Sequence, residues 1–205
     1  SCAKKGRGRP KVFDREAALD KAMTLFWQYG YEATSLSDLV EATGAKAPTL
    51  YAEFVNKEGL FRAVLDHYIS RFASKNEACL FCEDQTLLEA LRHYFTAVAT
   101  CFTSKDTPAG CFMINTSAAL AASSKEIAKT IKSRHAVQEQ TLYKFLQLRQ
   151  ARGEIPAEKN VAELAQFLSC ILQGMSISAR EGASFETLMQ ITETTLRLWP
   201  QMIAV

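Results

Sequence analysis

Apolar residues recur every three to four positions along almost the whole length of the 205-residue chain. This is the spacing of one face of an α-helix, and no convincing alternation of apolar and polar residues, which would indicate a half-buried strand, interrupts it. The pattern predicts an all-α protein of about nine helices, four short ones followed by a bundle of five. A link is expected over 76–85, and Pro200 is expected to close the last helix.

The chain divides into four parts by charge and by helix length. These are a flexible basic arm (1–12), three short helices (13–56), a connecting helix (57–75) and the long-helix bundle (76–205). The apolar content of 48% and charged content of 22% are typical of a globular protein. No apolar run exceeds five residues, whereas a membrane span needs roughly 20. We therefore expect no membrane partner and a cytoplasmic location.

The basic arm concentrates positive charge. Residues 1–11 carry five lysines and arginines and no acid, although the net charge of the whole chain is only +2. Its segment Gly6-Arg7-Gly8-Arg9-Pro10 resembles the core of an AT-hook, in which thin Arg-Gly-Arg segments enter a narrow A·T minor groove. Arg7 and Arg9 are therefore candidate DNA contacts. The alternative is a plain basic tail that binds or solubilises without preference.

Residues 36–54 contain two short helices joined through Gly44-Ala45-Lys46. A first helix, a tight glycine turn and a second helix form the helix-turn-helix arrangement, whose second helix can enter the major groove of DNA. The apolar residues that would hold the two helices at a fixed angle are Leu39, Val40, Leu50 and Phe54.

The same region resembles a known family. The stretch FWQYGYEATSLSDLVEATG from Phe26 to Gly44, with TLYAEF at 49–54 and NKEGLF at 56–61, is similar to the N-terminal domain of TetR-family transcriptional regulators. The likeness covers about residues 14–65. Beyond them only Gly110-Cys111-Phe112 and the general architecture resemble the family. The resemblance implies a helix-turn-helix DNA-binding domain and a C-terminal bundle for ligand binding and dimerisation.

The resemblance also implies particular DNA contacts. The N-terminus of the second helix would meet bases and phosphates, the Tyr51 hydroxyl a phosphate, and the start of the first helix another phosphate. Lys57 would add a positive charge where the helix dipole already favours an anion. One departure is that Lys46 replaces the usual small hydroxyl cap, so specificity leans on DNA shape. The implied contacts in these helices are Thr34, Ser35, Lys46, Ala47, Pro48, Thr49, Tyr51 and Lys57.

The bundle is expected to serve two further tasks. A pocket for a small hydrophobic or amphipathic effector is implied by the family, although simple core packing is the alternative for every one of its candidate residues. The last two helices would pair across a twofold axis to form a homodimer on a pseudo-palindromic operator. The candidate pocket residues are Phe95, Phe102, Phe112, Met113, Tyr143, Phe167 and Met175. The candidate dimer residues are Leu164, Leu168, Ile171, Leu172, Leu188, Ile191 and Leu196.

The remaining chemistry of the sequence favours binding rather than catalysis. We find no nucleophile elbow, zinc-protease motif or phosphate loop, so the chain is not expected to be an enzyme. His93 and His135 stand apart from other ligand types, so no metal or cofactor is expected. Six cysteines are interpreted as reduced, mostly buried thiols, and only Cys79 and Cys82 form a close pair. The function expected is that of a repressor released by an effector. Alternatives are an effector-independent DNA-binding protein and a thiol-redox sensor.

Deletion of residues 1–11 is predicted to weaken DNA binding about tenfold on duplexes with A·T-rich flanks, because arginines favour the narrow minor groove there. The dissociation constant measured at several salt concentrations should also become less salt-dependent. An equal loss on G·C-rich flanks would reduce the arm to a nonspecific tail.

Overall fold

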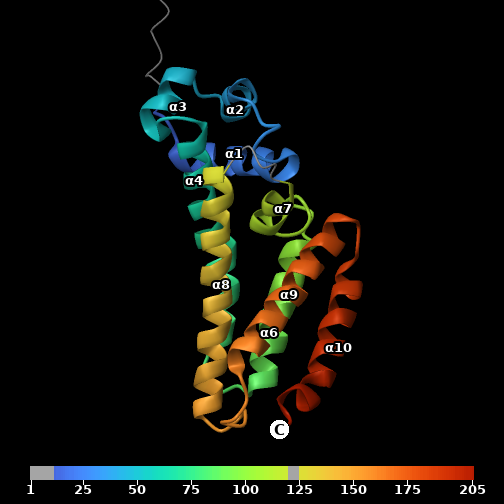
Figure 1. Cartoon of the computed structure of the whole chain (residues 1–205). Coiled ribbons are helices and arrows are strands. Elements are labelled where there is room, and N and C mark those ends of the chain that lie inside the picture. The colour runs from blue at the N-terminus through green and yellow to red at the C-terminus, as the bar shows by residue number, and fades with distance from the viewer. Residues whose placement is uncertain (1–11, 120–124) are drawn as a thin grey trace, which may run out of the picture.

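The computed structural model describes residues 12–119 and 125–205, and within these ranges the chain is helical with no strand (Figure 1). The predicted all-α class is confirmed. In chain order the helices are α1 (Arg15–Tyr29), α2 (Leu36–Thr43), α3 (Ala47–Phe54), α4 (Lys57–Tyr68), α5 (Ser74–Ala78), α6 (Leu87–Phe102), α7 (Phe112–Ala119), α8 (Lys125–Ala151), α9 (Val161–Arg180) and α10 (Phe185–Ile203).

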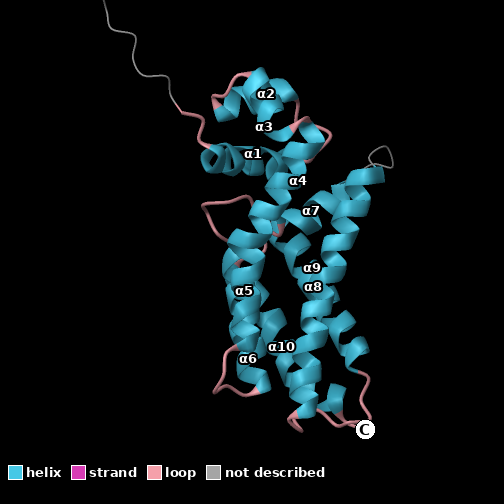
Figure 2. Ribbon diagram, turned by 90° about the vertical axis from the view of Figure 1, so that its left-hand side faces the viewer, coloured by secondary structure: helices cyan, strands magenta, loops and turns pink. Residues whose placement is uncertain are grey.

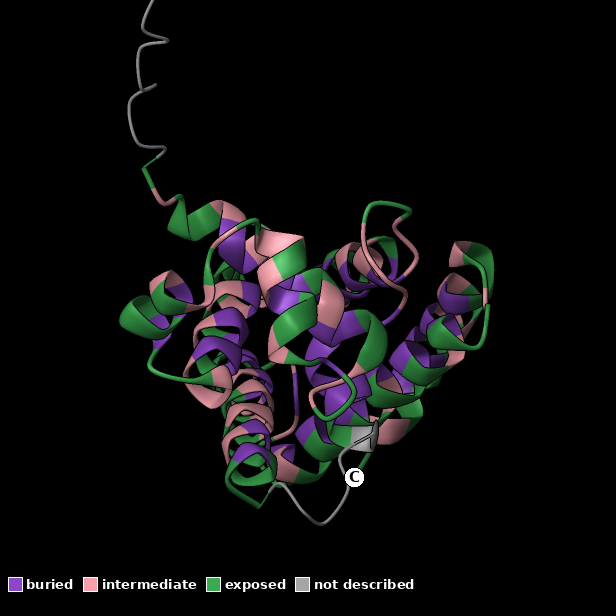
Figure 3. Ribbon diagram, turned by 90° about the horizontal axis from the view of Figure 1, so that it is seen from above, coloured by how far each residue is buried: buried purple, intermediate pink, exposed green. Residues whose placement is uncertain are grey.

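The first three helices gather at one end of the molecule, and the long helices extend away from them (Figures 1 and 2). α4 leaves the three-helix end and packs against α1, while α8 packs along α9 and α6 along α10. Viewed from above, the buried residues lie on the inner faces of the helices (Figure 3). The helices therefore bury their apolar stripes, as the periodicity predicts, except the five-residue α5, in which no residue is buried.

Local signals explain where the short helices begin. The Asp14 carboxylate accepts a hydrogen bond from the Ala17 N–H and begins α1. Ser35 and Asp38 form a reciprocal capping box at α2, which satisfies two backbone donors and lowers the pKa of the Asp38 carboxyl. Gly44 ends α2 in a left-handed conformation that suits glycine.

The expected link over 76–85 is wrong in its first half. After α4 the chain continues through a π-helical turn (Ile69–Ala73), α5 and a 3₁₀ turn (Cys79–Phe81) before it leaves the helical path. The segment from Leu60 to Phe81 contains no glycine or proline. Nothing in the local sequence therefore stops the helix. The break falls at 82–85, just before the Thr86 capping box of α6.

The expected end at Pro200 is also wrong, because α10 continues to Ile203. Pro200 lies in the last turn of the helix, and Trp199 beside it is buried in the core. Proline cannot donate a backbone hydrogen bond, but the burial of Trp199 holds the final turn of α10 against the core. Among the described helices, α9 alone has the length and hydropathy of a membrane span, and part of its surface is buried in the bundle. The sequence places Ser124, a residue type that commonly caps helices, directly before α8, and Ser124 lies outside the described residues.

The three-helix end is joined to the bundle by an aromatic cluster and a buried polar network. Trp27 of α1, Tyr68 of α4 and Phe112 of α7 pack with ring centroids 5.3 to 6.0 Å apart. The Tyr68 hydroxyl donates to Cys111 Sγ (3.2 Å), and the Cys111 N–H donates to Ser176 Oγ of α9 (2.7 Å). These two hydrogen bonds link α4 to α9 through Cys111.

This network leaves no room beside Gly110. The residue has φ +83°, and a Cβ there would lie 2.7 Å from the Ser176 carbonyl oxygen and 2.8 Å from Asn115 Nδ2. Ser176 Oγ donates to Asn115 Oδ1 (3.2 Å), so these neighbours are held in place by their own hydrogen bonds. A side chain at position 110 would therefore both strain the backbone and displace the network.

The substitution Gly110→Ala is predicted to lower the free energy of unfolding by about 3 kcal/mol, from backbone strain and crowding together. The matched control is Gly153→Ala, because Gly153 has a similar φ of +81° and open space around it. It should lose only about 1 kcal/mol, from the left-handed backbone alone. Urea unfolding of both variants checks the difference, and equal losses would show that crowding at Gly110 is unimportant.

Candidate nucleic-acid interface

The helix-turn-helix predicted over 36–54 is present. α2 and α3 are joined by Gly44, Ala45 and Lys46, with Gly44 at φ +68°. Leu39 and Leu50 are buried between the helices, and Phe54 is buried at the end of α3. These contacts fix the angle of α3 and leave its other side free.

The outer side of α3 carries most of the predicted contact residues. Lys46, Pro48 and Tyr51 are exposed, and Ala47 and Thr49 are half-buried. No side chain caps the start of α3, as the replacement of the hydroxyl cap by Lys46 predicts. The positive end of the helix therefore stays available to an anion.

The structure separates Thr34 from the other candidates. Its side chain is only 1% exposed, and its hydroxyl donates to the Gly30 carbonyl oxygen at 2.7 Å. A side-chain phosphate contact by Thr34 does not agree with this position, because the hydroxyl holds the α1–α2 turn together. Ser35 is exposed, and its Oγ accepts the Asp38 N–H while its own proton remains free to be donated.

Lys57 is the first residue of α4 and lies beside the α1–α2 turn. Its Nζ is 4.3 Å from the centroid of the Tyr31 ring. Burial lowers the pKa of the Lys57 ammonium, and nearby Glu32 opposes this change. The first turn of α4 is closed by Asn56, whose side chain accepts the Gly59 N–H at 2.8 Å. Lys57 is thus a fixed positive charge at the positive end of a helix.

The turn between α3 and α4 has a feature that the sequence did not indicate. Val55 has φ +73° and ψ −55°, and the Asn56 N–H donates to the Phe54 carbonyl oxygen at 2.9 Å. This is a γ-turn of the rare, strained kind, and it is occupied by a β-branched residue that is 75% exposed. Next to it, a Cβ on Gly59 would lie 1.9 Å from the Phe54 carbonyl oxygen, so only glycine fits.

A groove of about 550 Å³ runs beside the helix-turn-helix. Its walls are the first turn of α1 and the α2–α3 turn, and Lys21, Lys46 and Thr49 contribute to its lining. The chain enters α1 next to this groove, at Val12 and Phe13. Arg7 and Arg9 lie outside the described residues.

The candidate pocket residues divide between the core and the surface. Phe95, Phe102, Met113 and Met175 are buried in the core, and Phe112 is buried in the aromatic cluster between the domains. Their position supports the alternative of core packing. Tyr143 is half-buried on α8, where its hydroxyl accepts a hydrogen bond from Gln147. Phe167 is 39% exposed on α9, so its place in an interior pocket is wrong.

The candidate dimer residues fall on two different faces. Ile171 and Ile191 face outward and line a hollow of about 320 Å³ between α9 and α10, together with Phe167 and Leu198. The other five pack into their own bundle, so their assignment to an exposed interface is wrong: Leu164, Leu168, Leu172, Leu188 and Leu196. Apolar stripes at helical spacing occur on both sides of α9 and α10, and the sequence does not say which stripe faces inward.

The cysteines are less buried than expected. Cys111 is buried, but Cys82 and Cys170 are exposed, and Cys79 and Cys101 are half-buried. Cys2 lies outside the described residues. In the described part of the chain no three metal-binding side chains come together.

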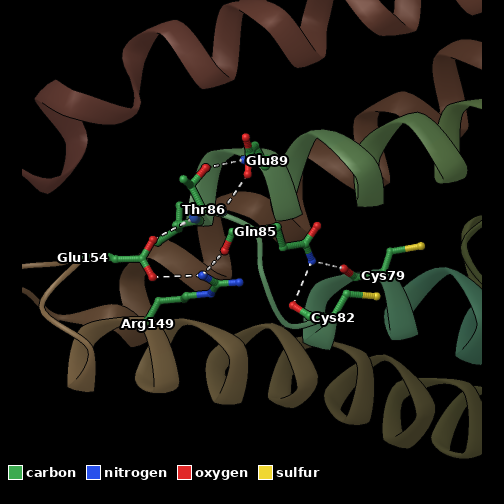
Figure 4. Close-up of polar contacts among 8 residues, drawn as sticks. Cys79, Cys82, Gln85, Thr86, Glu89, Arg149 and Glu154 are labelled. Atoms are coloured by element: carbon green, nitrogen blue, oxygen red, sulfur yellow. Dashed lines mark hydrogen bonds and ion pairs between the residues drawn. The ribbon is translucent and has the colours of Figure 1, made fainter.

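The polar contacts near Cys79 and Cys82 close the turn before α6 (Figure 4). The Gln85 amide donates to the carbonyl oxygens of both cysteines, at 2.7 and 3.3 Å. The buried Arg149 side chain donates to the Gln85 carbonyl oxygen and to Glu154. Glu154 in turn accepts the Leu87 N–H. These contacts join the end of α8 to the start of α6, and their role is to stabilise the fold.

Taken together, the buried α2–α3 contact, the exposed side of α3 and the separate helical bundle define a helix-turn-helix DNA-binding regulator. The comparisons identify its family. Residues 18–64 match the bacterial regulatory proteins of the tetR family, and residues 88–190 match the tetracyclin repressor-like C-terminal domain. The chain belongs to the TetR family.

Two curated relatives and one solved structure are informative. The chain is 72% identical to the HTH-type transcriptional repressor ComR of Escherichia coli (strain K12), over 98% of this chain and 96% of that protein. It is 31% identical to the HTH-type transcriptional repressor BdcR of the same strain, over 88% and 86% of the two chains. A cysteine mutant of the TetR family regulator CifR, complexed with operator DNA, superimposes with a TM-score of 0.88 at 31% identity, covering 94% of this chain and all of that one.

The substitution Val55→Gly is predicted to raise the free energy of unfolding by about 1 kcal/mol, since glycine adopts φ +73° without steric cost. Val12→Gly is a suitable control, because Val12 is similarly exposed and is not among the residues with positive φ. Thermal unfolding should show stabilisation by the first substitution only. A loss of stability in Val55→Gly would contradict the assigned strain.

Proposed function

We propose that this chain is a transcriptional repressor that binds a pseudo-palindromic operator as a homodimer and is released by a small hydrophobic or amphipathic effector. The single observation that carries the proposal is the rigid helix-turn-helix, whose exposed side bears Lys46, Pro48 and Tyr51. The names of the relatives ComR and BdcR support the repressor role.

α3 would lie in the major groove with its N-terminal turn toward the bases. The side chains of Ala47 and Pro48 can make only apolar contacts there, so the bases are distinguished by few hydrogen bonds. Thr49 and Lys46 are the polar groups of this turn, and Ser35, Tyr51 and Lys57 would meet the phosphates on either side. Phosphate contacts fix the register, while DNA shape supplies the remaining specificity.

Dimerisation would use the outward face of α9 and α10. Its apolar residues Phe167, Ile171, Ile191 and Leu198 remain partly exposed in one chain, and an exposed apolar patch of this kind is typical of an interface. An isologous pair of these helices would place two α3 helices on one side of the dimer. They could then reach successive major grooves about 34 Å apart.

An effector would act by changing the distance between the two α3 helices. α4 is the connection, because it begins beside α3 and passes the aromatic cluster where α1 and α7 meet it. Binding that favours another position of α4 would shift the population away from the operator-bound state. Release by the effector would be an equilibrium process without catalysis. It would take place in the cytoplasm, where bacterial DNA is found.

Selection of bound sequences from random duplex DNA tests the function directly. A twofold-symmetric sequence with half-sites one helical turn apart is expected. Enrichment of an asymmetric site, or weak binding without any sequence preference, would contradict a dimeric operator-specific repressor.

The paired substitution Ile171→Glu and Ile191→Glu is predicted to convert the dimer into folded monomers, because it places charges in an apolar interface where they lack partners. Operator affinity should fall about 100-fold, since each monomer then binds a single half-site. Sedimentation velocity and gel-shift titration check this. Val137→Glu is the control, because Val137 is an exposed apolar residue on α8, away from α9 and α10, and it should leave the dimer intact. A persistent dimer in the paired variant would exclude this face.

A further inference from the structure

The Lys57 ammonium rests on an aromatic ring rather than on a carboxylate. Its Nζ lies 4.3 Å from the centroid of Tyr31, well within the distance at which a ring face attracts a cation. We propose that Tyr31 is a positioning residue for DNA binding: it holds Lys57, still charged and partly dehydrated, ready to meet a backbone phosphate. The inference rests on the DNA binding proposed above and adds a residue beyond the DNA contacts that the family resemblance implies.

The Tyr31 ring is itself fixed by the core. It lies in the turn between α1 and α2, stacks on Phe26 with centroids 6.0 Å apart, and meets the edge of Phe61 at 5.2 Å. Both phenylalanines are completely buried. Tyr31 is therefore an immobile support, and the position of the lysine is set by the same core that orients α1 and α4.

The charges around Lys57 leave its ammonium available. Glu58, its neighbour on α4, is paired with Arg62 at 2.6 Å. Within the described residues, Lys57 has no carboxylate oxygen inside 4 Å. Glu32 acts on Lys57 only at longer range. A ring face attracts the cation without cancelling its charge, whereas a close carboxylate would neutralise it and compete with phosphate.

Two costs of binding a phosphate are reduced by this arrangement. A lysine that moves freely must lose side-chain entropy when it forms a contact, and a fully hydrated ammonium must shed water. Lys57 is already restrained and half-buried, and the lowering of its pKa by burial reflects the lost water. Its place in the first turn of α4, a helix of twelve residues, adds the favourable dipole of the helix.

The test is a double-mutant cycle on a duplex of mixed sequence, since phosphate contacts do not depend on sequence. Tyr31→Leu and Tyr31→Phe are each made alone and together with Lys57→Met. At about 0.1 M salt, Tyr31→Leu should weaken binding about fivefold and Tyr31→Phe less than twofold, because phenylalanine keeps the ring face. In the Lys57→Met background, Tyr31→Leu should have no further effect. Lys57→Met alone should reduce the salt slope by about one for each protomer bound, and so by about two for the dimer.

Tyr29→Leu is the matched control, because Tyr29 is an exposed aromatic at the end of α1 whose ring does not contact Lys57. Should Tyr31→Leu fail to fold, phenylalanines with one to three fluorine atoms can replace Tyr31. Fluorine withdraws charge from the ring face with little change of shape, so affinity should fall with each fluorine when Lys57 is present and stay constant in Lys57→Met.

Three outcomes would overturn the inference. Tyr31→Leu could weaken binding equally with and without Lys57, Tyr31→Phe could be as damaging as Tyr31→Leu, or fluorination could leave affinity unchanged. In each case DNA binding itself, and so the proposed function, would stand. Failure of the unaltered protein to bind any duplex would instead overturn both.

Discussion

The packing of Trp27, Tyr68 and Phe112 is the contact on which the rest of the structure depends, because the DNA-binding end and the bundle meet there. α1 contributes Trp27, α4 contributes Tyr68 and α7 contributes Phe112, so the cluster fixes the helices of the DNA-binding end relative to the bundle. The buried Trp27 indole N–H finds no acceptor within the described residues, and such an orphan donor costs about 1–3 kcal/mol.

The sequence predicted the helical parts of the DNA-binding end well, because their signals are local. The capping box at Ser35, the turn at Gly44 and the apolar spacing of α3 each act within a few residues, and the bounds of α3 agree with the prediction. The position of Thr34 was not predictable in this way. Its hydroxyl points inward because the Gly30 carbonyl is brought to it by the α1–α2 turn, and a hydroxyl beside a helix cap looks the same in sequence whether it faces DNA or the protein.

Predictions in the bundle were weaker for a related reason. Phe167 and Leu168 are adjacent apolar residues on α9, yet one is exposed and the other fully buried. Which of the two is buried depends on the side of α9 against which α6 and α8 pack. Tertiary packing decides this, and the local sequence does not. Val55 gives no signal at all, since the demand for its positive φ comes from the close approach of Gly59 to the Phe54 carbonyl. The strain at Val55 is balanced by the core contacts of Phe54 and Leu60 on either side.

The π-helical turn at Ile69–Ala73 interrupts the helical path that runs from Lys57 to Phe81, and it changes the direction in which the later side chains point. An i→i+5 turn holds one residue more than the α-helix requires, and each residue of an α-helix advances the chain by about 100°. Everything after the turn, including Asn76 and Glu77, is therefore rotated by roughly a quarter of a circle relative to an uninterrupted α4. This rotation brings Glu77 toward the bundle, where burial raises the pKa of its carboxyl to about 7. A single extra residue in one turn thus decides which side chains of α5 face the protein interior and which face water.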